Sequence, residues 1–148
     1  LTMERHANVQ YFSIYLWFQE RDLDGFASYF LNESQGEMEH AYKFANYFIA
    51  RGQTVKLKDL PAPIQAWDSI EDLISYSFNM EADLTSSLQQ LYAIAERTSD
   101  TRSSVFLDPI VEAQIKSEDE FAHILGKVKF AANHPSAILL INEDLKKK

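Results

Sequence analysis

The chain of 148 residues contains no cysteine. This absence excludes disulfide scaffolds, iron–sulfur clusters and zinc fingers, and leaves Glu, Asp, Gln and His for any metal ligation. Only four Gly and four Pro are present, so we expect few turns and long elements of secondary structure. Basic residues are also scarce. The net charge of −8 argues against nucleic-acid binding and fits attraction of cations.

Long hydrophobic runs are absent as well. The longest apolar stretches, such as Tyr11 to Phe18, are interrupted and far too short to span a bilayer, so we expect no membrane segment. Leu1 already lies within a helical pattern, so we expect that a few residues are missing or processed and that any targeting signal would lie outside these 148 residues. The 46% hydrophobic content is enough for one sizeable core, which predicts a single domain over residues 1–148.

Hydrophobic residues recur at helical spacing in four long segments and a short fifth, which predicts an all-α chain. The expected helices run from about Thr2 to Asp22, Phe26 to Arg51, Ser69 to Arg97, Ser104 to Ala131 and Ser136 to Leu145. A tight turn at residues 22–25 makes the first two helices antiparallel. The aperiodic stretch from Gly52 to Asp68 predicts a long crossover that makes the second and third helices parallel, as in a four-helix bundle. The fifth helix is too apolar to be exposed and suggests a subunit contact.

Polar residues interrupt the inward-facing stripes of three predicted helices, at Glu4, at Glu37 with His40, and at Glu81. Glu37 and His40 are three residues apart and therefore share a helical face, where both can bind one metal ion. A buried, unpaired carboxylate is energetically costly, and a bound cation removes that cost. The pattern predicts a metal site inside a helical bundle, with oxygen and imidazole ligands that suit iron or manganese.

The spacing of these residues along the two predicted hairpins supports a common site. Glu4 and Glu37 are 33 residues apart across one turn, and Glu81 and Gln114 are 33 apart across another. Hairpin arms of equal length place four polar side chains in one layer of a bundle. The alternative is that they are unrelated structural residues, because a lone Glu-x-x-His is common in helices and a stripe can be misplaced by one residue.

With these residues the chain resembles the ferritin family, of the iron-oxidising H-chain type, and closely resembles cyanobacterial and algal ferritins. The resemblance covers essentially the whole chain, including the crossover and the fifth helix. Its most specific stretches are residues 4–11, 37–40, 79–83 and 111–114. The resemblance implies a ferritin-like four-helix bundle with a long crossover between helices two and three and a short fifth helix.

The resemblance also implies a diiron centre within each subunit. By position, Glu4, Glu37 and His40 would hold the first iron. Glu37 would bridge to a second iron, which Glu81 would also hold. Hard carboxylate oxygens favour ferric over ferrous iron, so such a site drives oxidation. No cofactor other than iron is expected.

Two further residues belong to the implied centre. Gln114 would lie in its outer sphere or act through water, and Tyr11 would lie beside it. The implied activity is that of a ferroxidase, in which Fe(II) binds, dioxygen takes its electrons and Fe(III) passes to a mineral. The implied partners are Fe(II), dioxygen and further copies of the chain in a hollow shell of about 24 subunits. We expect iron storage and detoxification in the cytoplasm, or in a plastid if the source is a eukaryotic alga.

Three more acidic residues are candidates for iron transit. Glu33 lies one helical turn before Glu37, and Glu118 lies on the inner stripe of the fourth helix. Asp108 matches the region where three subunits meet in the family and would line an iron entry channel. The third iron site of many bacterial ferritins is not expected, because its acidic positions are here occupied by Gly36, Ala113, Lys116 and Ser117.

Two motifs have competing interpretations. Met38 matches a haem-ligating methionine of bacterioferritins, but non-haem ferritins also carry Met there, so we expect no haem. Glu120 and His123 form a second Glu-x-x-His, a motif that is paired in other diiron enzymes. Both lie off the inward-facing stripe of the fourth helix, and Glu120 is 39 residues from Glu81 instead of the 33 that separate Glu81 from Gln114. We interpret them as a surface pair.

Two alternative functions stay open at this point. The first is a diiron oxidase or peroxidase of the same fold that stores nothing, similar to rubrerythrin or bacterioferritin. The long crossover and apolar fifth helix, which suit a cage, argue against it. The second is a non-catalytic cage of the L-chain type, which the intact set of site residues argues against.

Overall fold

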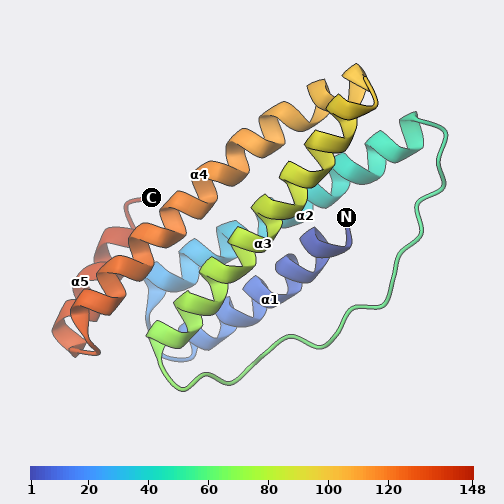
Figure 1. Cartoon of the computed structure of the whole chain (residues 1–148). Coiled ribbons are helices and arrows are strands. Elements are labelled where there is room, and N and C mark those ends of the chain that lie inside the picture. The colour runs from blue at the N-terminus through green and yellow to red at the C-terminus, as the bar shows by residue number, and fades with distance from the viewer. The chain divides into compact units, whose positions relative to one another are not determined.

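The structure is a computed structural model that describes all 148 residues. It contains five helices and no strand (Figure 1): α1 (Thr2–Gln19), α2 (Asp24–Ala50), α3 (Ile70–Arg97), α4 (Thr101–Ala131) and α5 (Pro135–Leu145). The prediction of an all-α chain with four long helices and a short fifth is therefore confirmed. None of the helices combines the length and apolar character needed to cross a membrane.

The chain divides into two compact units, each built on one pair of long helices. The first unit comprises residues 1–67 and 134–148 and contains α1, α2 and α5. The second comprises residues 68–133 and contains α3 and α4. Within each unit the two long helices form an antiparallel hairpin (Figure 1). The expectation of one domain over residues 1–148 stays a prediction.

An aromatic cluster joins α1 to α2. Tyr11, Phe18, Phe26 and Phe30 are all completely buried. The Phe18 ring stacks on Phe26 with centroids 4.7 Å apart and on Phe30 at 5.6 Å. Tyr11 also packs on Phe30 at 5.6 Å. Because each fully buried aromatic side chain contributes roughly 1.5–3 kcal/mol, these four rings supply much of the stability of the hairpin.

The turn between α1 and α2 begins earlier than the hydrophobic pattern predicts. α1 ends at Gln19 and not at Asp22, because Asp22 adopts a left-handed conformation with φ of 59°. The Leu23 N–H donates to the Phe18 carbonyl and the Asp22 N–H to the Gln19 carbonyl, which is the Schellman arrangement that terminates a helix. This position usually holds Gly, so an Asp there gave no clear sign of the helix end.

The crossover between α2 and α3 runs along α1 and is held there by hydrogen bonds from α1 side chains to the crossover backbone. Gln10 is 1% exposed, and its amide both donates to the Ile64 carbonyl and accepts from the Ile64 N–H, each at 2.9 Å. The Ser13 hydroxyl donates to the same carbonyl at 3.1 Å. Gly52, with φ of 79°, lies where the crossover was predicted to begin. The crossover is thus confirmed, and these bonds fix part of it against α1.

The first turn of α2 is capped by α5, at the other end of the chain. The N-cap residue of α2 makes no side-chain bond to its own helix. Instead, Asn142 Oδ1 accepts from the N–H groups of Gly25 at 2.8 Å and Phe26 at 3.1 Å. A Cβ on Gly25 would lie 1.8 Å from the Asn142 carbonyl oxygen, so only glycine fits. Gly25 was expected in the turn, but it lies inside α2, and the helix begins at Asp24 and not at Phe26.

The apolar residues of α5 divide between two faces of the helix. Ile138 and Ile141 are buried, whereas Leu139 and Leu140 are 54% and 69% exposed. α5 packs against α2 within the first unit. The expectation that this run is too apolar for exposure therefore fails for Leu139 and Leu140, because an 11-residue helix can bury only the side chains on one face. These two residues are left available for contact with another molecule.

The second unit has an aliphatic core with well-capped helices. The Ser69 hydroxyl caps α3 and the Asp100 carboxylate caps α4, which therefore begins at Thr101 and not at Ser104. Leu91 is 44% exposed, because the buried face of α3 continues from Leu88 to Ala95. The buried apolar residues are Leu73, Ile74, Leu84, Leu88, Ala95, Leu107, Ile110, Phe121, Ile124, Val128 and Ala131.

Candidate metal centre

Two carboxylates are buried in the first unit, one on each long helix. Glu4 on α1 is 6% exposed and Glu37 on α2 is 4% exposed. Both helices are amphipathic, and each carboxylate occupies a position that a hydrophobic residue would otherwise fill. Such burial is unfavourable for a charged group that has no partner. The sequence prediction that these two residues lie on buried stripes is confirmed.

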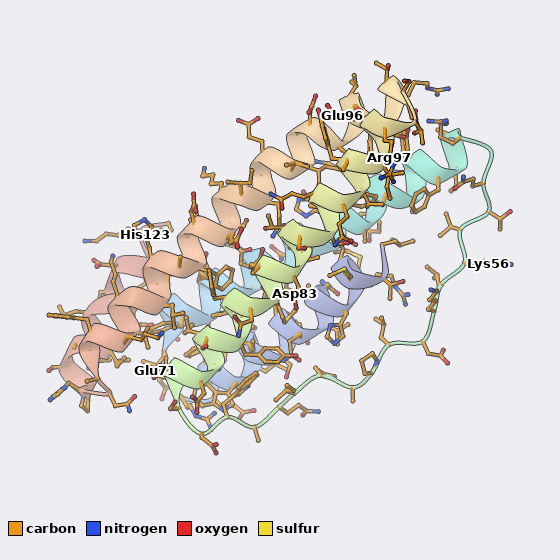
Figure 2. The ribbon with its side chains drawn as sticks, in the orientation of Figure 1. Lys56, Glu71, Asp83, Glu96, Arg97 and His123 are labelled. Atoms are coloured by element: carbon orange, nitrogen blue, oxygen red, sulfur yellow. The ribbon has the colours of Figure 1, made fainter.

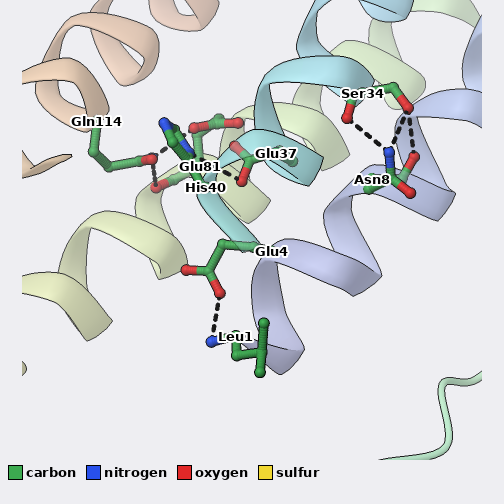
Figure 3. A network of polar contacts seen from close by, with 8 residues as sticks. All are labelled: Leu1, Glu4, Asn8, Ser34, Glu37, His40, Glu81 and Gln114. Atoms are coloured by element: carbon green, nitrogen blue, oxygen red, sulfur yellow. Dashed lines mark hydrogen bonds and ion pairs between the residues drawn. The ribbon is translucent and has the colours of Figure 1, made fainter. Parts of the chain in front are cut away.

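His40 lies beside Glu37 on the same face of α2, three residues further along (Figure 3). The distance from His40 Nδ1 to Glu37 Oε2 is 3.6 Å. Interaction with the Glu37 carboxylate raises the pKa of His40, and burial partly opposes this rise. Glu4 acts in the same direction as Glu37, so both carboxylates contribute to the negative potential at His40.

The Oε2 atoms of the two carboxylates differ in how they are paired. Glu37 Oε2 is buried without a hydrogen-bond partner, since the neighbouring His40 nitrogen is too far away for a good bond. Glu4 Oε2 has no hydrogen-bond partner beyond an ion pair with the Leu1 ammonium, at 2.7 Å (Figure 3). Buried oxygens of this kind are rare in proteins unless they serve a ligand. The first unit therefore offers two oxygen donors and one imidazole to a cation.

The second unit contains the other two polar residues predicted for the site. Glu81 on α3 is completely buried and Gln114 on α4 is 2% exposed. Gln114 Nε2 donates to Glu81 Oε2 at 2.6 Å and to the Glu81 carbonyl oxygen at 3.1 Å. The predicted match of Glu81 and Gln114 across 33 residues is therefore a direct contact (Figure 3). The short bond to Glu81 holds the Gln114 side chain in one orientation.

Tyr11 is the predicted neighbour of the centre. It is completely buried, two helical turns from Glu4 on α1, and packs on Phe30. Nowhere in the chain do three or more His, Asp or Glu side chains converge closely enough to hold a metal ion as they stand. The joint centre of Glu4, Glu37, His40 and Glu81 therefore stays a prediction.

The three candidates for iron transit lie in different environments. Glu33 and Glu118 are half-buried, whereas Asp108 is exposed. Asp108 lines an open groove of about 530 Å³ between α3 and α4, together with Tyr92 and other residues. A hydrogen bond to Asp108 raises the pKa of Tyr92. A transit role for any of the three stays a prediction.

The two motifs with competing interpretations are Glu120 with His123 on α4 and Met38 on α2. His123 is exposed on α4, where Figure 2 shows it projecting away from the helix, and Glu120 is half-buried. These positions agree with the interpretation of a surface pair. Met38 is half-buried on α2.

One feature of this region was not recognised from the sequence. Asn8 on α1 and Ser34 on α2, each about one helical turn from a buried carboxylate, bond to each other across the hairpin. No motif in the sequence identified Asn8 and Ser34 as partners. The similar offsets of the two residues, four from Glu4 and three from Glu37, were the signal available.

Comparison with known proteins assigns the chain to a family. The family model described as a ferritin-like domain matches residues 1–131. The chain belongs to the ferritin family. It is thereby a member of a family of iron-storage proteins. The resemblance that the sequence motifs indicated is confirmed.

Relatives of this ferritin come from several kinds of organism. The ferritin-1 heavy chain of Schistosoma mansoni is 34% identical over 121 residues, which cover 79% of this chain and 70% of the relative. The bacterial non-heme ferritin of Bacteroides fragilis is 27% identical over 145 residues, covering 98% of this chain and 90% of the relative.

Solved structures share the fold of this ferritin. The open-pore ferritin of Archaeoglobus fulgidus aligns with a TM-score of 0.92 at 25% identity, over 98% of this chain and 90% of that one. A PmFTN variant crystal soaked in iron aligns with a TM-score of 0.88 at 31% identity, over 95% and 91%. The predicted four-helix bundle with a crossover and a short fifth helix is therefore confirmed as the fold.

Proposed function

We propose that this ferritin oxidises Fe(II) with dioxygen at a diiron centre within each subunit and stores the Fe(III) as mineral inside a cage. The observation that carries the proposal is Glu37, a buried carboxylate with an unpartnered oxygen, three residues before His40 on one helical face. A divalent cation bound there gives Glu37 a partner and removes the cost of burying its charge.

The proposed ligands have distinct roles. Glu4, Glu37 and His40 bind one Fe(II), and Glu37 reaches a second Fe(II) that Glu81 also binds. Oxygen ligands stabilise Fe(III) more than Fe(II), so the donor set favours transfer of electrons to dioxygen.

Two neighbouring residues act on the ligands and not as ligands. Gln114 holds Glu81 Oε2 through a 2.6 Å bond, which leaves the rest of the carboxylate to the metal. Tyr11 is buried two helical turns from Glu4 and is the proposed partner for later electron transfer. Its replacement by Phe should leave Fe(II) binding intact and alter the steps that follow oxidation.

Storage requires assembly, and we propose a homo-oligomer of 24 copies. Leu139 and Leu140 on α5 expose apolar side chains that a neighbouring copy can cover, and Phe130 is 95% exposed. In such a cage the two units of each chain form one ferritin-like domain over residues 1–148. A stable monomer as the only species in analytical ultracentrifugation at neutral pH would exclude the storage function.

The central test is the oxidation rate of Glu37→Ala. We expect rapid Fe(II) oxidation to fall at least about tenfold, since loss of the bridging ligand raises the barrier by roughly 1.4 kcal/mol or more. Glu39→Ala is the matched control, because it removes an equal charge from an exposed position on the same helix. Stopped-flow absorbance after an oxygen pulse measures both. Equal rates in Glu37→Ala and wild type would show that the proposed centre is wrong.

A further inference from the structure

Two residues beside the proposed iron site form a reciprocal bond between α1 and α2. Asn8 Nδ2 donates to the Ser34 carbonyl oxygen at 2.7 Å and to Ser34 Oγ at 3.0 Å. Ser34 Oγ in turn donates to the Asn8 carbonyl oxygen at 2.8 Å (Figure 3). Each side chain therefore binds the backbone of the opposite helix. We call these two residues the Asn8–Ser34 clasp.

The use of the Ser34 hydroxyl is unusual for a helix. A serine inside a helix commonly donates to the carbonyl one turn earlier on its own helix, as Ser77 does to Leu73. Ser34 instead donates across to α1, although it is only 3% exposed. The hydroxyl thus acts as donor and acceptor in the same contact. Buried polar groups that are fully paired in this way hold a single arrangement of their helices.

The position of the clasp determines the level of the two carboxylates. Glu4 precedes Asn8 by four residues, about 6 Å along α1, and Glu37 follows Ser34 by three residues, about 4.5 Å along α2. Because the helices are antiparallel, both steps lead toward the same end of the hairpin. The clasp therefore places Glu4 and Glu37 within about 1.5 Å of the same level.

The aromatic contacts of the hairpin cannot fix this level alone. Stacked rings such as Phe18 and Phe26 tolerate small shifts along the helix axis, since their attraction has little directionality. Hydrogen bonds to backbone carbonyls do not tolerate such shifts, because their strength falls steeply with distance and angle. A slip of one residue would displace one carboxylate by about 1.5 Å and turn it by about 100°.

We propose that Asn8 and Ser34 are positioning residues for the iron site, which set the register of α1 and α2 so that Glu4 and Glu37 meet one metal ion. The proposal rests on the proposed function. It assigns to the clasp no contact with the metal and no part in electron transfer. Its effect is to keep two ligands from different helices at a common level before the ion arrives, which lowers the cost of binding.

The test uses Co(II) as the probe, without oxygen, because its visible absorption reports ligand geometry independently of oxidation. We expect the double variant Asn8→Ala with Ser34→Ala to bind Co(II) about tenfold more weakly, with a changed spectrum. Ser34→Ala alone, which keeps the bond from Asn8 to the Ser34 carbonyl, should give a smaller loss. Ser34→Thr, which keeps the hydroxyl, should restore nearly wild-type binding.

Two controls separate positioning from general stability. Phe26→Leu weakens the same hairpin far from the clasp and should lower the melting temperature without changing the Co(II) spectrum. Co(II) affinity within twofold of wild type in the double variant, or in Ser34→Ala if the double variant does not fold, overturns the proposal. Equal spectral changes in Phe26→Leu also overturn it. If wild type binds no Co(II), or Glu37→Ala binds it normally, the proposed iron site itself fails.

Discussion

The two hairpins of this ferritin differ in the hydrogen bonding of their buried carboxylates. In the α3–α4 hairpin, the Gln114 amide satisfies Glu81 Oε2 within the protein at 2.6 Å. In the α1–α2 hairpin, Glu37 Oε2 has no hydrogen-bond partner, and the nearby His40 is 3.6 Å away. One hairpin thus holds its buried carboxylate in one orientation through an amide. The other leaves a buried carboxylate oxygen without a hydrogen bond.

For the proposed iron site, this difference predicts that the two hairpins contribute differently to metal binding. A carboxylate held by an amide loses little conformational freedom when it binds an ion, so it mainly fixes the geometry of the ligands. A buried carboxylate without a hydrogen-bond partner gains the most electrostatic free energy when an ion binds, so it mainly raises the affinity of the site for the ion. The α1–α2 hairpin has to remain folded despite that unfavourable charge. Its aromatic cluster, the Asn8–Ser34 clasp and the cap from α5 supply the compensating stability.

The largest expected effect is on the link from α5 to the α1–α2 hairpin. Gly25→Ala places a methyl group in the Asn142 backbone, so α5 must move away, and we expect a loss of roughly 3 kcal/mol in the free energy of unfolding. Gly126→Ala in α4 is the control. No atom lies within 4 Å of its added Cβ, so it should stabilise by up to about 1 kcal/mol. Urea titration followed by circular dichroism measures both, and a neutral Gly25→Ala would contradict the close contact.

A smaller effect on stability, opposite in sign at the two positions, should distinguish Glu37 from Glu81. Without metal, and at a pH above the pKa of His40 where the imidazole is neutral, Glu37→Gln should raise the free energy of unfolding by about 1 kcal/mol, because it removes a buried charge that no cation compensates. Glu81→Gln should lower it by about 1 kcal/mol, since it weakens a charge-assisted bond. Thermal melts in a chelating buffer give the comparison. Changes of the same sign in both variants would remove the distinction between the hairpins.

The smallest expected effect is a pH dependence confined to the α1–α2 hairpin. The raised pKa of His40 means that its pairing with Glu37 stabilises the metal-free protein below the unfolded pKa, and that this contribution is lost as pH rises through the folded pKa. Metal binding has the opposite dependence, because an ion competes with the proton on His40. Anaerobic Co(II) affinity should therefore fall as pH decreases through the His40 pKa. In His40→Ala this part of the pH dependence should disappear.

The sequence predicted those parts of the fold and site that depend on regular helix geometry. A constant rise per residue is the reason that equal spacing across two turns located the contact between Glu81 and Gln114. The same regularity placed Glu4 and Glu37 on buried faces. The failures involve residues whose conformation is set by distant partners. Gly25 was assigned to a turn because nothing near it in sequence indicates the approach of Asn142.

Local exceptions to residue preferences account for the other errors. Asp22 takes the left-handed position that usually belongs to Gly, so α1 ended earlier than expected. α4 began early because Asp100 caps it through Ser103, within a stretch that resembles a polar turn. None of these features changes the hydrophobic period from which the helices were predicted.

The cap of α2 by Asn142 also has a consequence for the order of folding. The two bonds join residues 117 and 116 positions apart, so during synthesis α1 and most of α2 leave the ribosome long before their cap exists. Contacts of such long range form late, because the loop that separates them must first be closed. The start of α2 is therefore open to water in every nascent chain and closes when α5 arrives. A chain truncated before α5 thus lacks both the cap of α2 and the exposed leucines of α5.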